Sequence, residues 1–303
     1  MNVVHLGANM VALTAEQAHE LVLGPESLSW RYASDPRTVL GGAFVQLMHL
    51  THPTVGAGVR DHSSYRADPF GRLNRTLDYI NLVTYGGPDA VEVAQRVREM
   101  HRTIKGVNPD GTRYHAFEPE AFAWVQATLV NGLVMAADQL IGAAMTDVER
   151  EQLYREQLGL GLLLGVRRGD LPETWSEFET YRDDMIEKRL TFTDTAREYL
   201  DVVRRPNPPK ALSGLTSVLW PALRIPSGYA SMLITVGMLP AVIRERLDLT
   251  WSQSKQAQFD ALTATLRGVT PILPTRVRVS GPSRLRKRAD QIIGHPFAPQ
   301  AKS

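Results

Sequence analysis

The stretch that best reveals the fold is DAVEVAQRVREMHRTI, residues 89–104. Its apolar residues recur every three or four positions, which is the period of an amphipathic α-helix. One face of this predicted helix contains Val91, Ala94, Val97, His101 and Ile104. Because the other members of the face are apolar, the imidazole of His101 is expected to point toward the protein interior.

An inward-facing histidine has two interpretations. A neutral imidazole can bind a metal ion, or it can make a hydrogen bond within the core. Spacing alone favours the second interpretation, in which His101 donates to a backbone carbonyl. The metal-ligand interpretation stays open because the 303-residue chain has eight histidines and no cysteine.

The same helical period extends outward from this stretch over most of the chain. Aspartate, serine and threonine residues stand where helix caps are expected, and glycine or proline follows many of the apolar stripes. Only Val107–Ala116 contains a clear turn motif, and a short hairpin is expected there. We therefore predict an all-α protein with a single globular multi-helix domain over residues 1–303. The predicted helices run from Thr14 to about Gly24, Asp35 to His49, Asp68 to Gly86, Asp89 to Gly106, Glu118 to Leu140, Thr146 to Leu164, Glu173 to Leu190, Asp194 to Val203 and Trp251 to Arg267.

Two segments bear on domain organisation and on membranes. The prolines in Pro206–Pro209 could mark a domain boundary, but the segment after them is equally apolar, which favours one core. The apolar stretch Leu219–Ile243 is interrupted by prolines and an arginine. It is expected to form two or three buried helices joined by tight turns, and no transmembrane span. A basic tail is expected from about residue 275, most simply as a solvated face.

Composition excludes several classes of function. Without cysteine, the chain cannot use disulfides, thiolate zinc sites, iron–sulfur clusters or thiolate-ligated haem. The formal net charge of +2 is too small for a protein that binds nucleic acid over its whole surface. The N-terminal residues lack the features of a signal peptide, so a cytoplasmic location is expected.

A second group of residues that could carry chemistry precedes residue 89. Arg72, Arg75 and Thr76 stand at positions i, i+3 and i+4 of a predicted helix and share a face. They could meet a bound anion or a reactive oxygen species, although a solvated basic strip is the simpler interpretation. His49 and His52 could form a two-histidine metal site, but no acidic residue is near them in the sequence.

The order of several motifs resembles the family of latex clearing protein, a rubber oxygenase, and the membrane-bound oxygenase of mycophenolic acid biosynthesis. The resemblance covers somewhat under half of the chain, and it depends on the order and spacing of the motifs together. The motifs are Gln46-Leu47-Met48, His52-Pro53, Gly56–Val59, Asp68-Pro69, Arg72-Leu73, Thr76, Tyr85-Gly86, Val97–His101, Ile104–Gly106, Tyr114, Glu118-Pro119 and Trp124-Val125.

This resemblance implies a helical fold that holds one b-type haem, with His101 as the iron ligand. It also implies that Arg72, Arg75 and Thr76 lie on the distal side, where they would stabilise developing negative charge. Related rubber oxygenases have lysine where this chain has Arg75, and an arginine remains charged and does not bind iron. Related sequences commonly have histidine after Trp124-Val125, whereas this chain has Gln126.

The resemblance therefore predicts a haem-b-dependent oxygenase or related oxidoreductase that uses O₂ and an apolar small-molecule substrate. Two alternatives stay open at this point: a haem-binding carrier or sensor, and a helical interaction module that has lost the cofactor. The substrate, the redox partner and the oligomeric state do not follow from the sequence.

Overall fold

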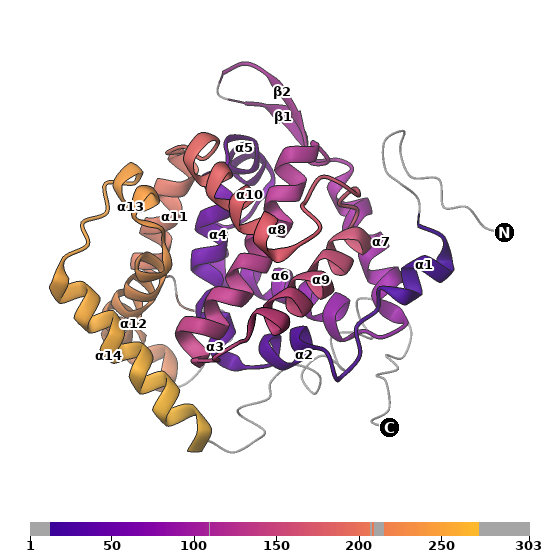
Figure 1. Cartoon of the computed structure of the whole chain (residues 1–303). Coiled ribbons are helices and arrows are strands. Elements are labelled where there is room, and N and C mark those ends of the chain that lie inside the picture. The colour runs from indigo at the N-terminus through magenta and orange to yellow at the C-terminus, as the bar shows by residue number, and fades with distance from the viewer. Residues whose placement is uncertain (1–12, 109, 207, 209–214, 273–303) are drawn as a thin grey trace.

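The computed structural model describes residues 13–272, apart from residues 109, 207 and 209–214. Helices pack around a central pair, α4 and α8, and a small hairpin projects from one end (Figure 1). The all-α prediction is confirmed. The elements in chain order are α1 Ala15–Glu20, α2 Leu28–Ala33, α3 Pro36–Leu40, α4 Gly42–Leu50, α5 Pro53–His62, α6 Pro69–Tyr85, α7 Asp89–His101, β1 Lys105–Val107, β2 Arg113–His115, α8 Pro119–Met135, the π-helix η1 Ala136–Ile141, α9 Asp147–Leu164, α10 Trp175–Lys188, α11 Asp194–Arg204, α12 Leu215–Met238, α13 Ala241–Arg246, α14 Gln253–Val269 and the 3₁₀-helix η2 Thr270–Ile272.

Side-chain caps explain where several helices begin. Thr14 and Thr146 each form a capping box. The threonine hydroxyl accepts from the backbone N–H of the third helical residue, and the side chain of that residue accepts from the backbone N–H of the threonine. The Asp68 carboxylate accepts from the Gly71 amide, and the Ser252 hydroxyl accepts from the Lys255 amide. These caps confirm the predicted starts of four helices.

The prediction for residues 35–62 was wrong in two respects. The helix expected over Asp35–His49 is divided at Gly41 into α3 and α4. No helix was predicted between His49 and Asp68, but Pro53 is the first residue of a further helix, α5. Proline suits that position because its fixed φ matches a helix and its missing amide would have had no partner.

The turn motif forms the expected hairpin. β1 and β2 are antiparallel, and Gly106 pairs with Tyr114. The Tyr114 hydroxyl donates to Asp61 of α5, at 2.8 Å, which fixes the base of the hairpin to the helical body. The hairpin tip lies at the top of Figure 1, away from that body.

The main core lies between α4, α8 and the helices that surround them. Phe44, Leu47 and Trp124 are fully buried there, and the Trp124 indole donates to the Met48 carbonyl at 3.0 Å. Leu233 and Met238 of α12 belong to the same core. The segments before and after Pro206–Pro209 therefore share one core, and the described residues form a single helical domain.

The expected turns and burial of residues 219–243 were only partly right. Pro221 and Pro226 lie inside one continuous helix, α12, and the second helix, α13, begins after Pro240. The first half of α12 is exposed, whereas the second half enters the core. Pro221 and Pro226 are both exposed, so the helix can bend or lose a backbone bond there without leaving a polar group buried.

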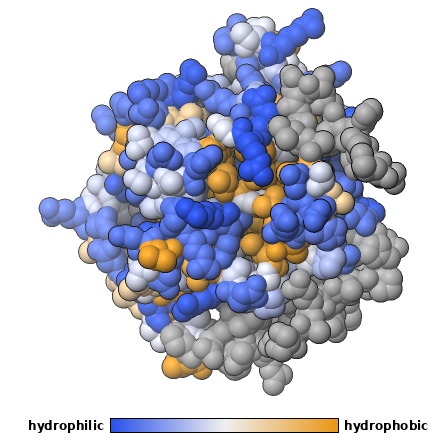
Figure 2. Space-filling view, turned by 45° about the vertical axis from the view of Figure 1, so that its right-hand side comes forward, coloured by the Kyte–Doolittle hydropathy of each residue, from blue (hydrophilic) through white to orange (hydrophobic). Residues whose placement is uncertain are grey.

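Most of the molecular surface is hydrophilic. Figure 2 shows the face that comes forward from the right of Figure 1, where a band of hydrophobic residues reaches the surface near the centre. Within the described residues, no helix combines the length and apolarity needed to span a membrane. The predicted basic tail from about residue 275 lies outside the described residues.

Candidate functional site

The candidate site forms where α6 and α7 meet. The short connection Gly86–Pro88 joins these two helices, which pack against each other as an antiparallel pair. A side chain at Gly86 would overlap the Leu82 carbonyl oxygen, so glycine is required for this close turn. The antiparallel arrangement brings the start of α6, with Arg72, and the end of α7, with His101, to the same end of the pair.

His101 has one ring nitrogen bonded and one without a partner. Its Nδ1 lies 2.7 Å from the Val97 carbonyl oxygen, one helical turn earlier. Because a carbonyl can only accept, Nδ1 carries a proton, and in the neutral form of an imidazole bonded in this way Nε2 presents a lone pair. Nε2 has no hydrogen-bond partner among the residues that the structure describes. A histidine that binds a metal through Nε2 usually makes such a bond at its other nitrogen. The bond is also made outside metal sites, as by the exposed His19 to the Ala15 carbonyl at 2.7 Å.

Two phenylalanine rings lie beside the His101 imidazole. The centroids of Phe117 and Phe122 are 6.5 Å and 6.3 Å from that of His101, and the two phenyl rings contact each other at 5.1 Å. Phe117 follows the hairpin and Phe122 belongs to α8. The imidazole, which is half-buried, therefore has an apolar wall on this side.

Arg72 is a half-buried cation that is bound by neutral groups. Its Nε donates to the Ser63 hydroxyl at 3.1 Å, and its terminal nitrogen donates to the Gln46 side-chain oxygen. Burial lowers the pKa of Arg72 from its ordinary value, and the nearby positive charge of Arg75 acts in the same direction. No carboxylate within 4.0 Å offsets its charge in the described part of the chain. Among the residues that the structure describes, the Gln46 side-chain nitrogen is also buried without a partner.

Arg75 differs from Arg72 in its exposure to solvent. The side chain of Arg75 is 52% exposed; it donates to the Ser64 hydroxyl at 2.9 Å and lies 3.5 Å from the Asp68 carboxylate. The Thr76 hydroxyl donates to the Arg72 carbonyl at 3.0 Å, and Thr76 is half-buried. Of the two arginines expected to act together with Thr76, Arg72 is the one that is partly shielded from solvent.

Two further residues surround Arg72 from other helices. His49 of α4 is buried and its Nε2 donates to the Val125 carbonyl at 3.2 Å. Burial lowers the pKa of His49 to about 3, and the Arg72 charge acts in the same direction. Burial also raises the pKa of Tyr199, from α11, to about 12, although Arg72 opposes this effect. Both groups are therefore neutral at pH 7.

His49 predicts a specific dependence of stability on pH. Its pKa in the folded state lies below the value of about 6.5 expected in the unfolded chain, so the unfolded chain binds more protons between pH 6.5 and 3. The stability is complete above about pH 6.5 and falls as the pH is lowered toward 3, by up to about 1.4 kcal/mol per pH unit. Urea unfolding from pH 7 to 4.5 should show a shallower decline in His49→Gln than in the wild type.

The exposed His62 provides the control for this measurement. His62→Gln should follow the wild-type dependence on pH. Parallel curves for the wild type and His49→Gln would contradict the assignment of a neutral, buried His49.

The expected alternative of a two-histidine metal site is not formed. His49 binds Val125, whereas the Nε2 of His52 lies 3.5 Å from the Glu120 carboxylate, which also pairs with Arg189. Burial lowers the pKa of His52, and Glu120 opposes this shift. No group of three or more histidine, aspartate or glutamate side chains able to hold a metal ion occurs among the described residues.

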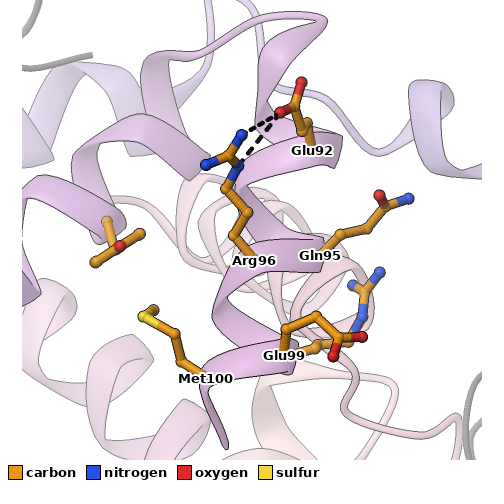
Figure 3. Close-up of a pocket in the computed structure, with 7 residues that line it drawn as sticks. Glu92, Gln95, Arg96, Glu99 and Met100 are labelled. Carbon is orange, nitrogen blue, oxygen red and sulfur yellow. Dashed lines mark hydrogen bonds and ion pairs between the residues drawn. The ribbon is translucent and has the colours of Figure 1, made fainter. Parts of the chain in front are cut away.

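A pocket of about 520 Å³ lies beside α7, but it is not at His101. Its lining residues are Tyr79, Glu92, Gln95, Arg96, Arg98, Glu99 and Met100 (Figure 3). At 100° per residue, Glu92 and Glu99 fall on the face of α7 opposite to His101. An ion pair of 2.9 Å joins Glu92 and Arg96 across the rim. We therefore assign this charged pocket no role in binding at the imidazole.

Gln126, which stands where related sequences commonly have histidine, has a structural position. It is buried, and its amide donates to the Gln157 carbonyl at 2.8 Å, which links α8 to α9. Gln157 in turn donates to the Ser29 hydroxyl at 2.9 Å. The observed bonds place Gln126 in the packing between helices.

Comparison with known proteins identifies the family. The model of the family described as "ER-bound oxygenase mpaB/B'/Rubber oxygenase, catalytic domain" matches residues 30–268. The chain belongs to this family. It is also 27% identical over 235 residues to the uncharacterized proteins Mb2261 of Mycobacterium bovis and Rv2237 of Mycobacterium tuberculosis, with 76% of this chain and 88% of each relative covered. No solved structure gives a significant match.

Proposed function

We propose that this chain is a haem-b-dependent oxygenase that acts on an apolar small molecule and uses His101 as the iron ligand. The bond from His101 Nδ1 to the Val97 carbonyl carries this proposal, because it leaves Nε2 available and fixes the plane of the ring. Family membership supports the oxygenase class. The rings of Phe117 and Phe122 support an apolar environment next to the imidazole.

The residues present fit a haem in their chemistry. A b-type haem needs one good axial donor, and a neutral imidazole is a common one. The group also carries negative charge, to which Arg72 and the Gln46 side-chain nitrogen could donate hydrogen bonds, since in the described part of the chain the first has no carboxylate partner and the second has no partner. Bound haem would supply the redox chemistry of iron with O₂.

The chain's own residues would determine where charge is stabilised. Arg72 holds a positive charge in a half-buried position, where such a charge acts more strongly than at the surface. Gln46 and Ser63 hold its guanidinium in one orientation. Thr76 could donate a hydrogen bond only if its hydroxyl turned away from the Arg72 carbonyl. Arg75 would act from the rim, since half of its side chain faces solvent.

An absorption spectrum of the purified protein tests this proposal. After incubation with ferric haem and removal of the excess, we expect a Soret band and about one haem per chain, held by one axial imidazole. A protein that stays colourless after this treatment would contradict the proposal and favour a cofactor-free helical module. A Soret band without any O₂ consumption in the presence of reductant and candidate substrates would favour a carrier or sensor.

A further inference from the structure

The pocket beside α7 is lined by side chains of both charges (Figure 3). Its volume of about 520 Å³ is enough for a small molecule, and we call it the α7 pocket. Tyr79 of α6 contributes to the lining, and the other lining residues project from successive turns of α7. Glu92 and Glu99 fall on the face of α7 opposite to His101, so the α7 pocket is distinct from the candidate site at that imidazole.

Arg98 is the cation in this lining whose charge is not offset. In the described part of the chain, no carboxylate lies within 4.0 Å of its guanidinium. One terminal nitrogen donates to the Leu163 carbonyl near the end of α9, which fixes the side chain between the two helices. Nε is buried without a partner, and the second terminal nitrogen also has no acceptor among the described residues. Because an arginine stays charged, the α7 pocket contains a positive charge with unused donors.

The other charged side chains of the lining have partners. Glu92 and Arg96 form an ion pair of 2.9 Å, and Glu99 lies 3.0 Å from Arg102. Burial lowers the pKa of Arg98, and the nearby Glu99 opposes this shift. The two carboxylates of the lining repel a ligand with two negative charges, such as a phosphate, whereas a single negative charge matches the surplus of Arg98. The charges therefore select a monoanion.

Apolar and neutral side chains complete the lining. Met100 is 45% exposed although it is a large apolar residue, and Tyr79 is half-buried. A thioether and an aromatic ring both contact apolar groups favourably, and methionine adapts to ligands of different shape. The Gln95 amide can donate or accept a hydrogen bond beside them. A matching ligand therefore has an apolar body in addition to its single negative charge.

We propose that the α7 pocket binds a small monocarboxylate with an apolar body. The carboxylate accepts a charge-assisted hydrogen bond from the free terminal nitrogen of Arg98, and the body lies against Met100 and Tyr79. The site is independent of the proposed haem, because its ligand needs no contact with the Nε2 atom of His101.

A ligand-observed NMR titration of the full chain tests the proposal with two probes. The probes are 4-phenylbutyrate and its neutral carboxamide, 4-phenylbutyramide, which share the same apolar body and differ in charge. We expect the carboxylate to bind at least about tenfold more tightly than the carboxamide, because a hydrogen bond to a charged group is stronger than one between neutral groups.

Substitutions of Arg98 test which residue recognises the carboxylate. Arg98→Met should weaken binding of 4-phenylbutyrate at least about tenfold and leave binding of the carboxamide unchanged, because the positive charge is lost. Arg98→Lys keeps a positive charge, so this variant should keep the preference for the carboxylate.

Two further variants control for net charge and for folding. Arg113→Met removes the same charge from an exposed position outside the α7 pocket, so it should bind both probes as the wild type does. Arg98→Met also loses the bond to Leu163, and thermal unfolding will show whether it stays folded. Gln95→Glu leaves that bond in place and adds a negative charge to the lining, so it should weaken binding of the carboxylate several-fold and spare the carboxamide.

Three results would overturn the proposal. One is the absence of any binding of 4-phenylbutyrate to the wild type. Another is equal affinity of the wild type for the carboxylate and the carboxamide. The third is wild-type affinity for the carboxylate in both Gln95→Glu and a folded Arg98→Met, which would place the bound carboxylate elsewhere on the protein. None of these measurements uses haem, so they stand or fall separately from the proposed function.

Discussion

Replacing His101 with alanine is expected to abolish haem retention or reduce haem affinity by more than about 100-fold. Loss of an outer partner of a metal ligand already costs about 10–100-fold in affinity, and here the ligand itself is removed. The helix should persist, because His101 is the last residue of α7 and is only half-buried. The measurement is titration with ferric haem, followed through the Soret band, together with circular dichroism of the apoprotein.

His115→Ala is the control for this experiment. His115 lies in β2 near Phe117, with ring centroids 5.6 Å apart, but it is exposed. Its replacement should leave haem affinity unchanged. Adding free imidazole should partly restore the spectrum of His101→Ala. A wild-type Soret band in His101→Ala without imidazole would show that His101 is not the ligand.

Replacing Arg72 with methionine is expected to slow O₂-dependent turnover by about 10²–10³-fold, as the loss of one preorganised charge or donor does elsewhere. Arg75→Met should have a much smaller effect, because half of the Arg75 side chain faces solvent. Turnover is measured once a substrate is identified; before that, the rate at which O₂ reoxidises the reduced, haem-loaded protein serves as the readout.

Thermal unfolding distinguishes a functional Arg72 from a structural one. Arg72 is a half-buried charge without a carboxylate partner among the described residues, so its replacement by a side chain of similar length breaks no ion pair. We therefore expect Arg72→Met to keep its melting temperature while losing rate. A large fall in melting temperature with an unchanged rate would show that Arg72 has a structural role only. Equal slowing in Arg72→Met and Arg75→Met would show that Arg75 contributes to turnover as much as Arg72 does.

Local signals explain why much of the fold was predictable. The caps at Thr146 and Ser252 act within one helical turn, so the sequence near them is sufficient to place α9 and α14. The helix α5 was missed because a proline such as Pro53 can stand just after one helix or at the first position of the next. The exposure of α12 was also missed, because an apolar run does not reveal whether other helices will cover it.

The candidate site was predictable only along α6 and α7. His101 stands four residues after Val97, so its bond to that carbonyl follows from helical spacing. The contact of Gln46 with Arg72 joins α4 to α6, and no local pattern in the sequence encodes how those helices cross. The same holds for the exposure of Arg75, which shares a helical face with Arg72 but lies beyond the part that the body covers.

The projecting hairpin offers a practical route to site-specific labelling. Because the chain has no cysteine, a thiol introduced at the exposed Arg113 in β2 would be unique. Arg113→Cys would carry one fluorophore at a defined position in β2. Arg113 is not one of the residues that contact His101 or Arg72. Fluorescence of such a conjugate would report ligand binding in real time without any change to His101 or Arg72.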